Sequence, residues 1–502
     1  MTTVKHLVVG AGFAGLGMAI KLQESGEVDF LVIEKGSDVG GTWRANDYPG
    51  AACDVPSQLY SYSFAPNPDW SMSFSPQPEI QAYIRRVAHE AGVLDRFRFE
   101  VALETATWDD EARAWQVTLS DGSGVSATNL ISGAGGLSEP KLPDIDGIEG
   151  FQGEVFHSAR WNHDVDLTGK RVAVIGTGAS AIQIVPELQK VVGHLDVYQR
   201  TAPYVLPRND RRYTGVEKLA FRHLPLVQRA YRTAIYWGRE LYVPGFTLEP
   251  KLAWPAKKLA LGNIAKGIND PELRATVTPD YEIGCKRILI SNTYYPALAS
   301  GNVEVVTDGI AKITGDAVVT SDGVERPVDV LVVATGFFTT EQPIAAAITG
   351  RTGATLAETW RETGMVAYKG TTVHGFPNLF QIVGPNTGLG HSSMVFIIES
   401  QIAYILDAIR TMEREGYSSV EPHLDVQNRW NDDLQRRMQR TVWNSGGCAS
   451  WYLDEEGRNT TLWPRTTFTF RRLLAQFDVA SYAVTGPAPS PTPAPTNEKV
   501  SA

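Results

Sequence analysis

Two stretches of the chain combine a short apolar run, a glycine-rich turn and a helix-like pattern. They are HLVVGAGFAGLGMAIKLQ, over 6–23, and RVAVIGTGASAIQIVPELQ, over 171–189. A short apolar run bounded by glycine is typical of a buried strand, and apolar residues three or four positions apart indicate an amphipathic helix. Strand, turn and helix in this order open a βαβ unit. The pattern therefore predicts a doubly wound α/β fold with parallel sheets.

Three other segments depart from this pattern. The stretch 99–136 alternates apolar and polar residues around an Asp121-Gly122 turn, which predicts strands joined by a tight turn. Between about 211 and 280, helical stretches are broken by prolines, which predicts an α-helical insertion whose Lys and Arg residues form a solvated face. Alternating prolines near the C-terminus predict a disordered tail over 486–502, because this composition cannot bury enough apolar surface to fold.

Composition narrows the possible functions. The 502 residues suffice for about three domains, and 43% hydrophobic with 20% charged residues is typical of a globular protein. The net charge of −10 argues against a nucleic-acid partner, which would require cations to neutralise phosphates. The nine histidines show no ligand-like clustering, so we expect no metal.

The cysteines and the apolar stretches indicate in which cellular compartment the protein works. Cys53, Cys285 and Cys448 lie far apart without CxxC spacing, which disfavours an oxidising compartment, a zinc ribbon and a dithiol redox centre. The most apolar long stretch, MVFIIESQIAYILDAI, is interrupted by the polar run Glu399–Gln401 and is too short for a membrane span. The N-terminus shows no charged leader, so we expect a cytoplasmic protein without a membrane partner.

The first glycine-rich turn fits G-x-G-x-x-G at Gly10, Gly12 and Gly15. The first glycine permits a tight turn, the second lets the backbone approach a pyrophosphate, and the third lets the helix pack on the strand. Glu34 ends the next apolar run 24 residues after Gly10 and can accept hydrogen bonds from the ribose of FAD or NAD. The alternative is a strand–helix turn without a ligand. Further expected contacts of this site are Phe13, Ala14 and Lys35.

The second turn has Gly176, Gly178 and Ala181, with alanine allowed at the third position. Arg200 lies 24 residues after Gly176, where the first site has an acid. A guanidinium there suits the 2′-phosphate of NADP through charge-assisted hydrogen bonds. The alternative is a surface arginine in an ordinary loop. Further expected contacts are Thr177, Ala179, Ser180, Gln183 and Thr201.

Two dinucleotide sites of different type indicate a flavoprotein that takes hydride from NADPH. A flavin disulfide reductase would need a redox-active cysteine pair, which the cysteine spacing does not provide. We therefore expect two Rossmann-like domains, one for FAD and one for NADP, with the helical insertion in the NADP domain. The expected boundaries are 1–142 and 376–485 for the two parts of the FAD domain, and 152–375 for the NADP domain.

The segment after Glu34, GGTWRANDYPGAACDVPS, resembles the sequence fingerprint of the Baeyer–Villiger monooxygenases. Every fixed position of that fingerprint is filled, by Gly40, Gly41, Trp43, Tyr48, Pro49, Gly50 and Asp54. A second family signature is similar to FQGEVFHSARWN, with matches at Phe151, Gly153, His157 and Trp161 and with Asn162 in place of the usual Pro or Asp. VATGF (333–337) and GPNTGLGHSSMVFIIESQ (384–401) also resemble family segments, and the likeness runs from about Thr3 to Ala480.

The resemblance implies an FAD monooxygenase that uses NADPH and O2 to convert ketones to esters or lactones, through a flavin peroxide and a tetrahedral adduct. An anionic adduct needs a fixed cation, and the family's arginine in a G-x-K-R segment corresponds to Arg287 in GCKR. By the same resemblance, Asp54 positions this arginine, Lys286 helps to hold the 2′-phosphate, and Trp451 contacts the nicotinamide cofactor. The other expected flavin-site residues are Gly41, Thr42, Trp43 and Tyr60.

Three further side chains receive modest roles. His157 is expected to be structural or to control a hinge, His391 to lie near the flavin, and Cys53 to be a small packed thiol. The resemblance also implies a domain rotation about 142–152 and 375–385.

Two alternatives remain open at this point. A flavin monooxygenase that oxygenates sulfur or nitrogen would use the same cofactors without needing Arg287, although Trp161 favours the Baeyer–Villiger branch. A non-catalytic dinucleotide-binding protein would share the fold. No motif specifies the ketone, the regiochemistry, the stereochemistry or the oligomeric state.

Overall fold

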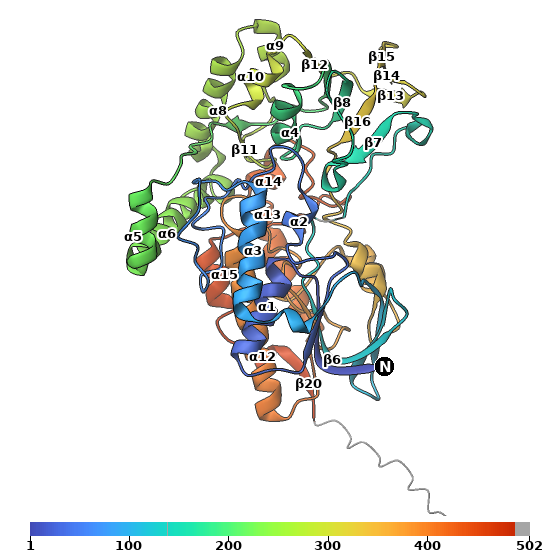
Figure 1. Ribbon diagram of the computed structural model, residues 1–502. Helices are drawn as coiled ribbons and strands as arrows, with labels where there is room; N and C mark the ends of the chain where they lie inside the picture. Colours follow the sequence, from blue (N-terminus) through green and yellow to red (C-terminus); the bar gives the residue numbers. More distant parts are fainter. Residues whose placement is uncertain (138, 487–502) are drawn as a thin grey trace, which may run out of the picture.

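The polypeptide forms two lobes, one built around a largely parallel sheet and the other around a fully parallel sheet, in a computed structural model that describes residues 1–137 and 139–486 (Figure 1). The lobe with the N-terminus holds the first glycine-rich turn, and the other lobe holds the second. The predicted tail lies outside the described residues, apart from Gly486.

The first lobe contains an eight-stranded sheet in the order β17-β4-β5-β6-β1-β2-β3, with β18 paired to β6. Strands β18, β6, β1, β2 and β3 run parallel, while β4, β5 and β6 form an antiparallel meander around the predicted turn. The strands are β1 (Thr2–Val9), β2 (Phe30–Ile33), β3 (Phe97–Arg98), β4 (Leu103–Asp109), β5 (Ala114–Leu119), β6 (Gly124–Ser132), β17 (Ile348–Thr349) and β18 (Leu379–Gln381).

The two faces of this sheet are covered by different layers. Val8 of β1 packs into the cluster under α1, α3 and α12, whereas Leu7 and Val9 face a second cluster under η5 and α11. This is the alternation expected of a strand buried on both faces. The other elements of the lobe are α1 (Phe13–Glu24), α2 (Thr42–Ala45), α3 (Gln77–Ala91), η1 (Leu94–Arg96), η5 (Pro343–Ala347), α11 (Leu356–Thr363), α12 (Met394–Glu415), β19 (Ser419–Pro422), α13 (Leu424–Met438), α14 (Val442–Ser445), α15 (Thr467–Leu473), η6 (Val479–Ser481) and β20 (Tyr482–Thr485).

The second lobe has a five-stranded parallel sheet in the order β12-β9-β8-β16-β7. Val172 and Val174 of β8 face helices α4 and α10, and Ala173 and Ile175 face the small antiparallel sheet β13-β14-β15. The strands are β7 (Glu154–His157), β8 (Arg171–Ile175), β9 (His194–Tyr198), β10 (Val205–Leu206), β11 (Leu289–Ile290), β12 (Val303–Val306), β13 (Ile310–Ile313), β14 (Ala317–Thr320), β15 (Glu325–Pro327) and β16 (Val330–Val333).

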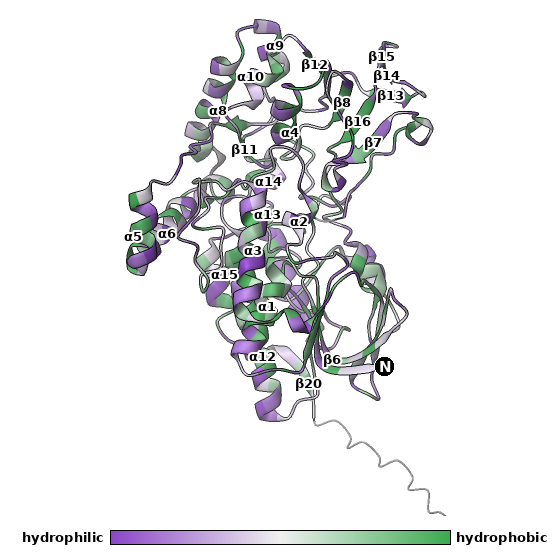
Figure 2. Ribbon diagram, in the orientation of Figure 1, coloured by the Kyte–Doolittle hydropathy of each residue, from purple (hydrophilic) through white to green (hydrophobic). Residues whose placement is uncertain are grey.

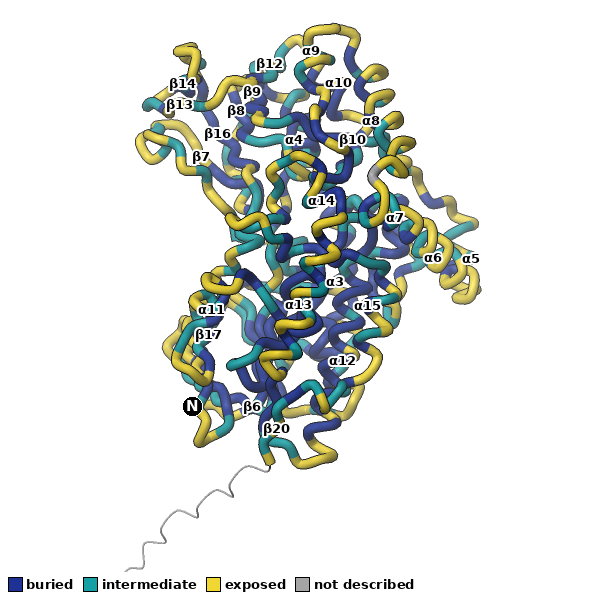
Figure 3. Tube along the Cα trace, turned by 180° about the vertical axis from the view of Figure 1, so that it is seen from behind, coloured by how far each residue is buried: buried dark blue, intermediate teal, exposed yellow. Residues whose placement is uncertain are grey.

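The predicted helical insertion is a group of helices between β10 and β11. Figures 1 and 3 both show α5, α6 and α8 along one side of the molecule, and Figure 3 labels α7 beside α6. The helices of the second lobe are η2 (Ile148–Gly150), η3 (Ser158–Arg160), α4 (Ala181–Leu188), α5 (Gly215–His223), α6 (Pro225–Glu240), α7 (Val243–Thr247), η4 (Pro250–Ala253), α8 (Trp254–Gly267), α9 (Pro271–Thr276) and α10 (Tyr294–Leu298).

The second lobe ends earlier than the expected boundary at 375. Strand β17 pairs with β4 in the first sheet, and Leu356, Trp360 and Val373 are buried in the core of the first lobe. The segment 343–375 therefore belongs to the first lobe and corrects the expected division. A short apolar run in this segment could form a strand of either lobe, because long-range pairing decides which sheet it joins.

The chain crosses between the lobes at two adjacent points. Lys141 donates a backbone hydrogen bond of 3.0 Å to the carbonyl of Gly336, and Pro140 bridges to Phe337. The first crossing lies next to the expected segment 142–152, but the second lies near 337 and not at 375–385. Among the described helices, none is long and apolar enough to cross a membrane.

Candidate active site

The first glycine-rich turn forms a tight anion cradle. Gly10 has a positive φ of 96°, and a Cβ on Gly15 would lie 1.8 Å from the Gly10 carbonyl oxygen. Gly41, with a φ of 54°, approaches Gly12 so closely that its Cβ would lie 2.8 Å from the Gly12 Cα. The N-terminus of α1 has no side-chain cap, so its free N–H groups point at this cradle. These features fit the pyrophosphate of a dinucleotide.

Glu34 lies at the end of β2 and is fixed by the same turn. Its carboxylate accepts hydrogen bonds of 2.7 Å from the backbone N–H groups of Ala11 and Gly36. Each carboxylate oxygen keeps acceptor capacity, so Glu34 can also accept from ribose hydroxyls. Lys35 is exposed and pairs with Glu139 instead of turning toward the cradle.

Aromatic side chains line the wall beside this turn. The Trp43 indole N–H donates to the Tyr60 hydroxyl over 2.9 Å, and Phe13 meets the Tyr60 ring edge-on at 5.3 Å between centroids. Burial raises the pKa of Tyr60 well above its usual value, so the phenol stays neutral. The arrangement gives a rigid, mostly apolar surface of the kind that binds a flat ring system.

The second turn has the same backbone features, but the space beside its second glycine is more open. Gly176 has a φ of 117°, and a Cβ there would lie 2.5 Å from the Ala334 carbonyl oxygen. Gly178 faces open space, and the N-terminus of α4 has no side-chain cap. The Thr177 hydroxyl donates to the Thr201 carbonyl over 3.0 Å, which ties the turn to the segment with Arg200.

Arg200 and Lys286 are far apart in the sequence of the second lobe, but they lie close enough for their charges to interact. Burial lowers the pKa of Lys286, and the Arg200 charge lowers it further. Two like charges this close are favourable when a dianion lies between them, as the 2′-phosphate of NADP would. The pair fits the expected phosphate site.

Gln183 connects the lobes in this structure. Its side-chain oxygen accepts from the Tyr48 hydroxyl at 3.0 Å and from the Ala52 N–H at 3.3 Å. Its amide donates to the Ala52 carbonyl at 2.9 Å. The structure thus gives Gln183 an inter-lobe contact in addition to its predicted place beside the cofactor.

Arg287 and Asp54 are joined across the lobes although 233 residues separate them in sequence. The guanidinium donates from Nε at 3.0 Å and from Nη2 at 2.6 Å, both to Asp54 Oδ2. Burial opposes ionisation of Asp54, but the Arg287 charge outweighs it and lowers the pKa of the carboxyl. The Asp54 carboxylate raises the pKa of Arg287, so the guanidinium is permanently charged.

Two side chains beside this pair were missed by sequence reasoning. Arg239 of α6 lies close enough for its charge to interact with Asp54 and Arg287, and its buried Nε has no hydrogen-bond partner among the described residues. Tyr452 is buried; burial raises its pKa to about 12, against the opposing effect of the Arg287 charge. No local signal identified Arg239, because the basic residues of the insertion had been interpreted as a solvated face.

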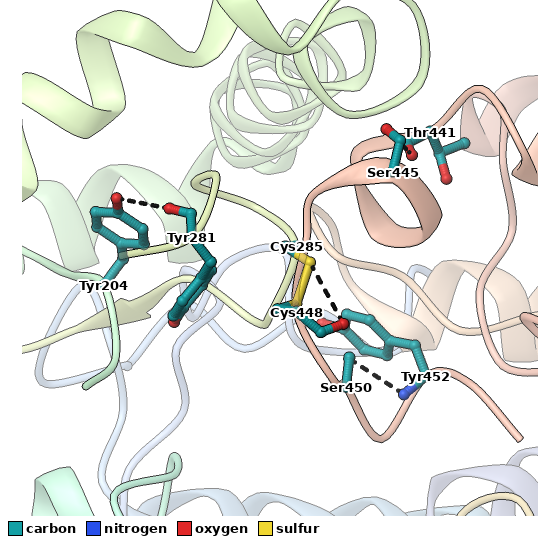
Figure 4. Close-up of a disulfide and its surroundings, with 8 residues drawn as sticks. All are labelled: Tyr204, Tyr281, Cys285, Thr441, Ser445, Cys448, Ser450 and Tyr452. Atoms are coloured by element: carbon teal, nitrogen blue, oxygen red, sulfur yellow. Dashed lines mark hydrogen bonds between the residues drawn. A yellow bond between two sulfur atoms is a disulfide. The ribbon is translucent and has the colours of Figure 1, made fainter. Parts of the chain in front are cut away.

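The cysteine spacing gave no indication of a bond that the structure shows. Cys285 and Cys448 form a disulfide, with Cα atoms 6.2 Å apart and 163 residues between them in sequence (Figure 4). Spacing could not indicate this pairing because the fold alone brings the two segments together. Disulfides are rare in reducing compartments, so this bond does not support the expectation of a cytoplasmic protein. Cys53 is free and buried, as predicted.

The remaining predicted residues take mostly structural positions. His157 is buried, accepts the Ala159 N–H at Nδ1 and packs edge-on against Phe337 beside the lobe crossing. His391 lies 3.2 Å from Glu240 of α6, which ties the insertion to the first lobe. Trp451 is 43% exposed, and its ring is tilted by 55° against that of Tyr452, with the centroids 4.4 Å apart.

One histidine lies close to two carboxylates, a group that the sequence did not indicate. His194, Asp196 and Glu304, on neighbouring strands, bring their ligand atoms within 4.8 Å of one another. His194 already pairs with Asp196, and Arg326 already pairs with Glu304 at 2.9 Å. The group is therefore already engaged in contacts within the protein.

Two dinucleotide cradles, one suited to an unphosphorylated ribose and one to a 2′-phosphate, define a flavoprotein oxidoreductase that uses NADPH. Comparison with known proteins is more specific. Residues 3–234 match the flavin-binding monooxygenase-like family. The chain is 50% identical to a Baeyer–Villiger monooxygenase of Pseudomonas aeruginosa, over 96% of this chain and 91% of that protein. It is also 50% identical to one of Streptomyces coelicolor, over 97% and 94%.

Solved structures agree with these relatives. An oxidised steroid monooxygenase bound to NADP is 31% identical with a TM-score of 0.84, and the match covers 96% of this chain and 99% of that one. The closed form of cyclohexanone monooxygenase is 27% identical with a TM-score of 0.86, over 97% and 100%. OTEMO in complex with FAD and NADP is 27% identical with a TM-score of 0.87, over 96% and 99%.

The chain therefore belongs to the Baeyer–Villiger monooxygenase family. It is an NADPH- and FAD-dependent monooxygenase that converts ketones to esters or lactones. Its fold matches family structures with FAD and NADP dinucleotide-binding domains. Because the predicted FAD cradle lies in the first lobe and the predicted NADP cradle in the second, we call these lobes the FAD domain and the NADP domain.

Proposed function

We propose that Arg287 and Asp54 form the catalytic pair of this ketone monooxygenase, and that Arg200 and Lys286 select NADPH. The observation that carries the proposal is the two-point contact of the Arg287 guanidinium with Asp54 across the two domains. A charged arginine held by a carboxylate of the FAD domain has a fixed position next to the predicted flavin wall. Fixed cations are most effective when their orientation is set before the reaction begins.

Reduced FAD, when bound, supplies the electrons with which O2 is activated for attack on the ketone carbonyl. Arg287 stabilises the negative charge that develops on the carbonyl oxygen during this attack. Asp54 keeps the guanidinium aimed at that oxygen and leaves its other N–H donors free. Arg239 adds a second buried cation, which raises the positive potential of the site.

The domain arrangement supports a hinge at the two adjacent crossings near 140 and 337. The NADP cradle moves with the second lobe, whereas Asp54 stays with the first. A rotation there would change the Arg287–Asp54 contact and the Gln183 contact together. Oxidised and NADP-bound crystal structures with the same inter-domain angle would contradict this hinge.

Replacement of Arg287 by alanine tests the catalytic pair. We expect the Arg287→Ala variant to lose ketone oxygenation by about 10²–10³-fold, the usual effect of removing one stabilising donor. Its flavin should still be reduced by NADPH, because the arginine acts only at the later step. Anaerobic stopped-flow reduction, followed by mixing with O2 and a ketone series, measures both steps separately.

The exposed Arg361 of α11 provides a matched control, and Arg361→Ala should keep both activities. Full ketone oxygenation by Arg287→Ala would overturn the proposed role. If the variant instead oxygenates sulfides as fast as the wild type, Arg287 acts only on carbonyl substrates, as a tetrahedral adduct requires. Failure of NADPH to reduce the flavin in both proteins would indicate that the cofactor assignment itself needs revision.

A further inference from the structure

The exposed apolar side chains of this protein are concentrated in the helical insertion. Of the 24 large apolar residues that are exposed in the described part of the chain, 13 lie between Val216 and Leu261. This segment is less than a tenth of the sequence. Figure 2 shows apolar and polar positions side by side along α5, α6 and α8. Scattered apolar residues on a surface are ordinary, but such a concentration marks an interaction site.

Helix α6 presents an unpaired apolar stripe. Leu226, Ala230, Ala234, Trp237 and Leu241 follow one another at intervals of three or four residues, so they share one face of the helix. All five are exposed, with Leu226 at 76%, Trp237 at 52% and Leu241 at 80%. The opposite face is turned inward, where Gln228 and Glu240 are buried. The helix therefore has polar residues buried on its inward face and an apolar stripe in solvent.

Helix α8, on the same side of the molecule in Figures 1 and 3, carries further exposed apolar residues. Trp254, Lys258 and Leu261 lie on one exposed face, and Trp254 is 61% exposed. A neighbouring groove of about 910 Å³ is lined by Trp254, Leu259, Lys258 and Lys266, together with the loops around 207–209 and 292–296. Its walls combine apolar rings and chains with ammonium groups. We call the exposed side chains of Leu226, Trp237, Leu241, Trp254 and Leu261 the insertion surface.

The charge of the insertion is opposite to that of the whole protein. Residues 215–266 contain nine Lys and Arg and three Asp and Glu, a net charge of +6, whereas the chain carries −10. Among the described residues, no ion pair forms at Arg229, Lys251, Lys258 or Lys266, which are all exposed. A basic surface with exposed tryptophan and leucine combines the two attractions that anionic bilayers offer.

We propose that the insertion surface docks on an anionic lipid bilayer, with α6 and α8 lying in the plane of the headgroups. The tryptophans and leucines enter the boundary between headgroups and acyl chains, and the lysines contact lipid phosphates. A second copy of the chain fits less well, because a two-fold contact would place two surfaces of the same +6 charge against each other. The inference does not depend on the roles proposed for Arg287 and Asp54.

Vesicle sedimentation tests the proposal with the full-length holoenzyme. One set of vesicles is phosphatidylcholine alone, and the other contains phosphatidylcholine and phosphatidylglycerol. We expect a bound fraction at least about tenfold higher on the anionic vesicles, with a loss of binding as salt is raised. Equal binding to both sets, or no binding to either, would overturn the proposal.

Three double variants identify the surface that binds. Trp237→Ser with Leu241→Ser removes part of the stripe, and Lys258→Gln with Lys266→Gln removes two free charges. Each should lower binding to anionic vesicles about tenfold or more while NADPH still reduces the flavin. The control, Val28→Ser with Leu424→Ser, removes exposed apolar groups elsewhere and should bind like the wild type.

Retained flavin absorbance and an unchanged thermal midpoint show that each variant is folded. Wild-type binding by both surface variants would overturn the assignment to the insertion surface. Sedimentation velocity tests the alternative that the insertion surface binds a second copy of the chain. A wild-type dimer that Trp237→Ser with Leu241→Ser converts to monomer, without vesicle binding, would assign the surface to a second copy of the chain.

Discussion

Arg287 and Asp54 come from different domains, and each sets the ionisation of the other. Burial alone would raise the pKa of Asp54, and the Arg287 guanidinium, 2.6 Å away, makes the largest contribution that lowers it. Loss of the arginine leaves a partly buried acid that keeps the weaker effect of the Arg239 charge.

The stability of Arg287→Ala should depend on pH for this reason. In the wild type the folded pKa of Asp54 is lowered, so the pair stabilises the fold above the unfolded value and loses its effect as pH falls through the folded value. In the variant, burial raises the pKa, so the cost is greatest at neutral pH and disappears on acidification. We expect the variant to be about 2 kcal/mol less stable at pH 7, the usual cost of leaving a partly buried polar group without its partner, with a smaller difference toward pH 4. Thermal midpoints followed by flavin fluorescence measure this, and a difference that grows in acid would contradict it.

Arg200 should determine the choice of nicotinamide cofactor. Only NADPH carries the 2′-phosphate that a guanidinium can bind through two hydrogen bonds. We expect Arg200→Ala to raise the KM for NADPH about tenfold or more, an exposed charge-assisted contact being worth roughly 1.4 kcal/mol. The KM for NADH should stay unchanged. Initial-rate kinetics with both cofactors measure this, with Lys312→Ala as an exposed control in the same domain. An equal loss for both cofactors would place the phosphate elsewhere.

At the scale of elements, the loop before β11 is held at several points. The Glu282 N–H bonds to the Gly446 carbonyl, Gly284 packs on Phe246 and Val442, and Cys285 is bonded to Cys448. The next two residues are Lys286 and Arg287. The disulfide thus joins a segment of the FAD domain to the loop that presents both cations of the site.

Reduction of this disulfide should lower stability. Removing a native disulfide typically costs roughly 2–4 kcal/mol, because the unfolded chain gains freedom. We expect a dithiol reductant to lower the thermal midpoint of the wild type to that of Cys285→Ser with Cys448→Ser. The reductant should leave the double variant unchanged, since Cys53 has no partner. An unchanged wild-type midpoint, together with three alkylated thiols, would show that the bond does not form in solution.

The elements differ in how far the sequence could predict them. The turns at Gly10 and Gly176 were predictable, because glycine spacing and the flanking apolar runs are local. The α/β fold with two dinucleotide-binding domains is confirmed by the solved structures. The Arg287–Asp54 contact was inferred only through a family resemblance. The Cys285–Cys448 bond was not predicted, because it depends on segments that meet only in the folded chain.

The position of β17 and the role of Arg239 escaped sequence reasoning for related reasons. A two-residue strand has no periodicity to detect. Helix α6 has one buried face and one exposed face. The sequence alone does not show which basic residues of such a helix are covered by the neighbouring domain. Long-range packing, and not local pattern, decides both cases.

At the scale of the whole molecule, many polar contacts tie the two domains together, and Gln183 makes three of them beside the cofactor cradles. We expect Gln183→Ala to loosen the domains, because the Tyr48 hydroxyl and both backbone groups of Ala52 lose their hydrogen bonds, at a cost of roughly 1–3 kcal/mol. Limited proteolysis at the crossings should become faster. Gln189→Ala, which removes a contact within the NADP domain, is the matched control. Equal proteolysis of both variants and the wild type would show that other contacts fix the domain angle.

The return of β17 to the first sheet has a consequence for synthesis on the ribosome. The NADP domain lies between 141 and 336, and these two points are joined by a 3.0 Å backbone hydrogen bond. The FAD sheet receives β17 and β18 only after this whole insert has been translated. An insert whose ends lie close together can fold as a unit before the FAD sheet has received its last two strands, β17 and β18. The same closeness of ends makes the domain a natural unit for exchange between relatives.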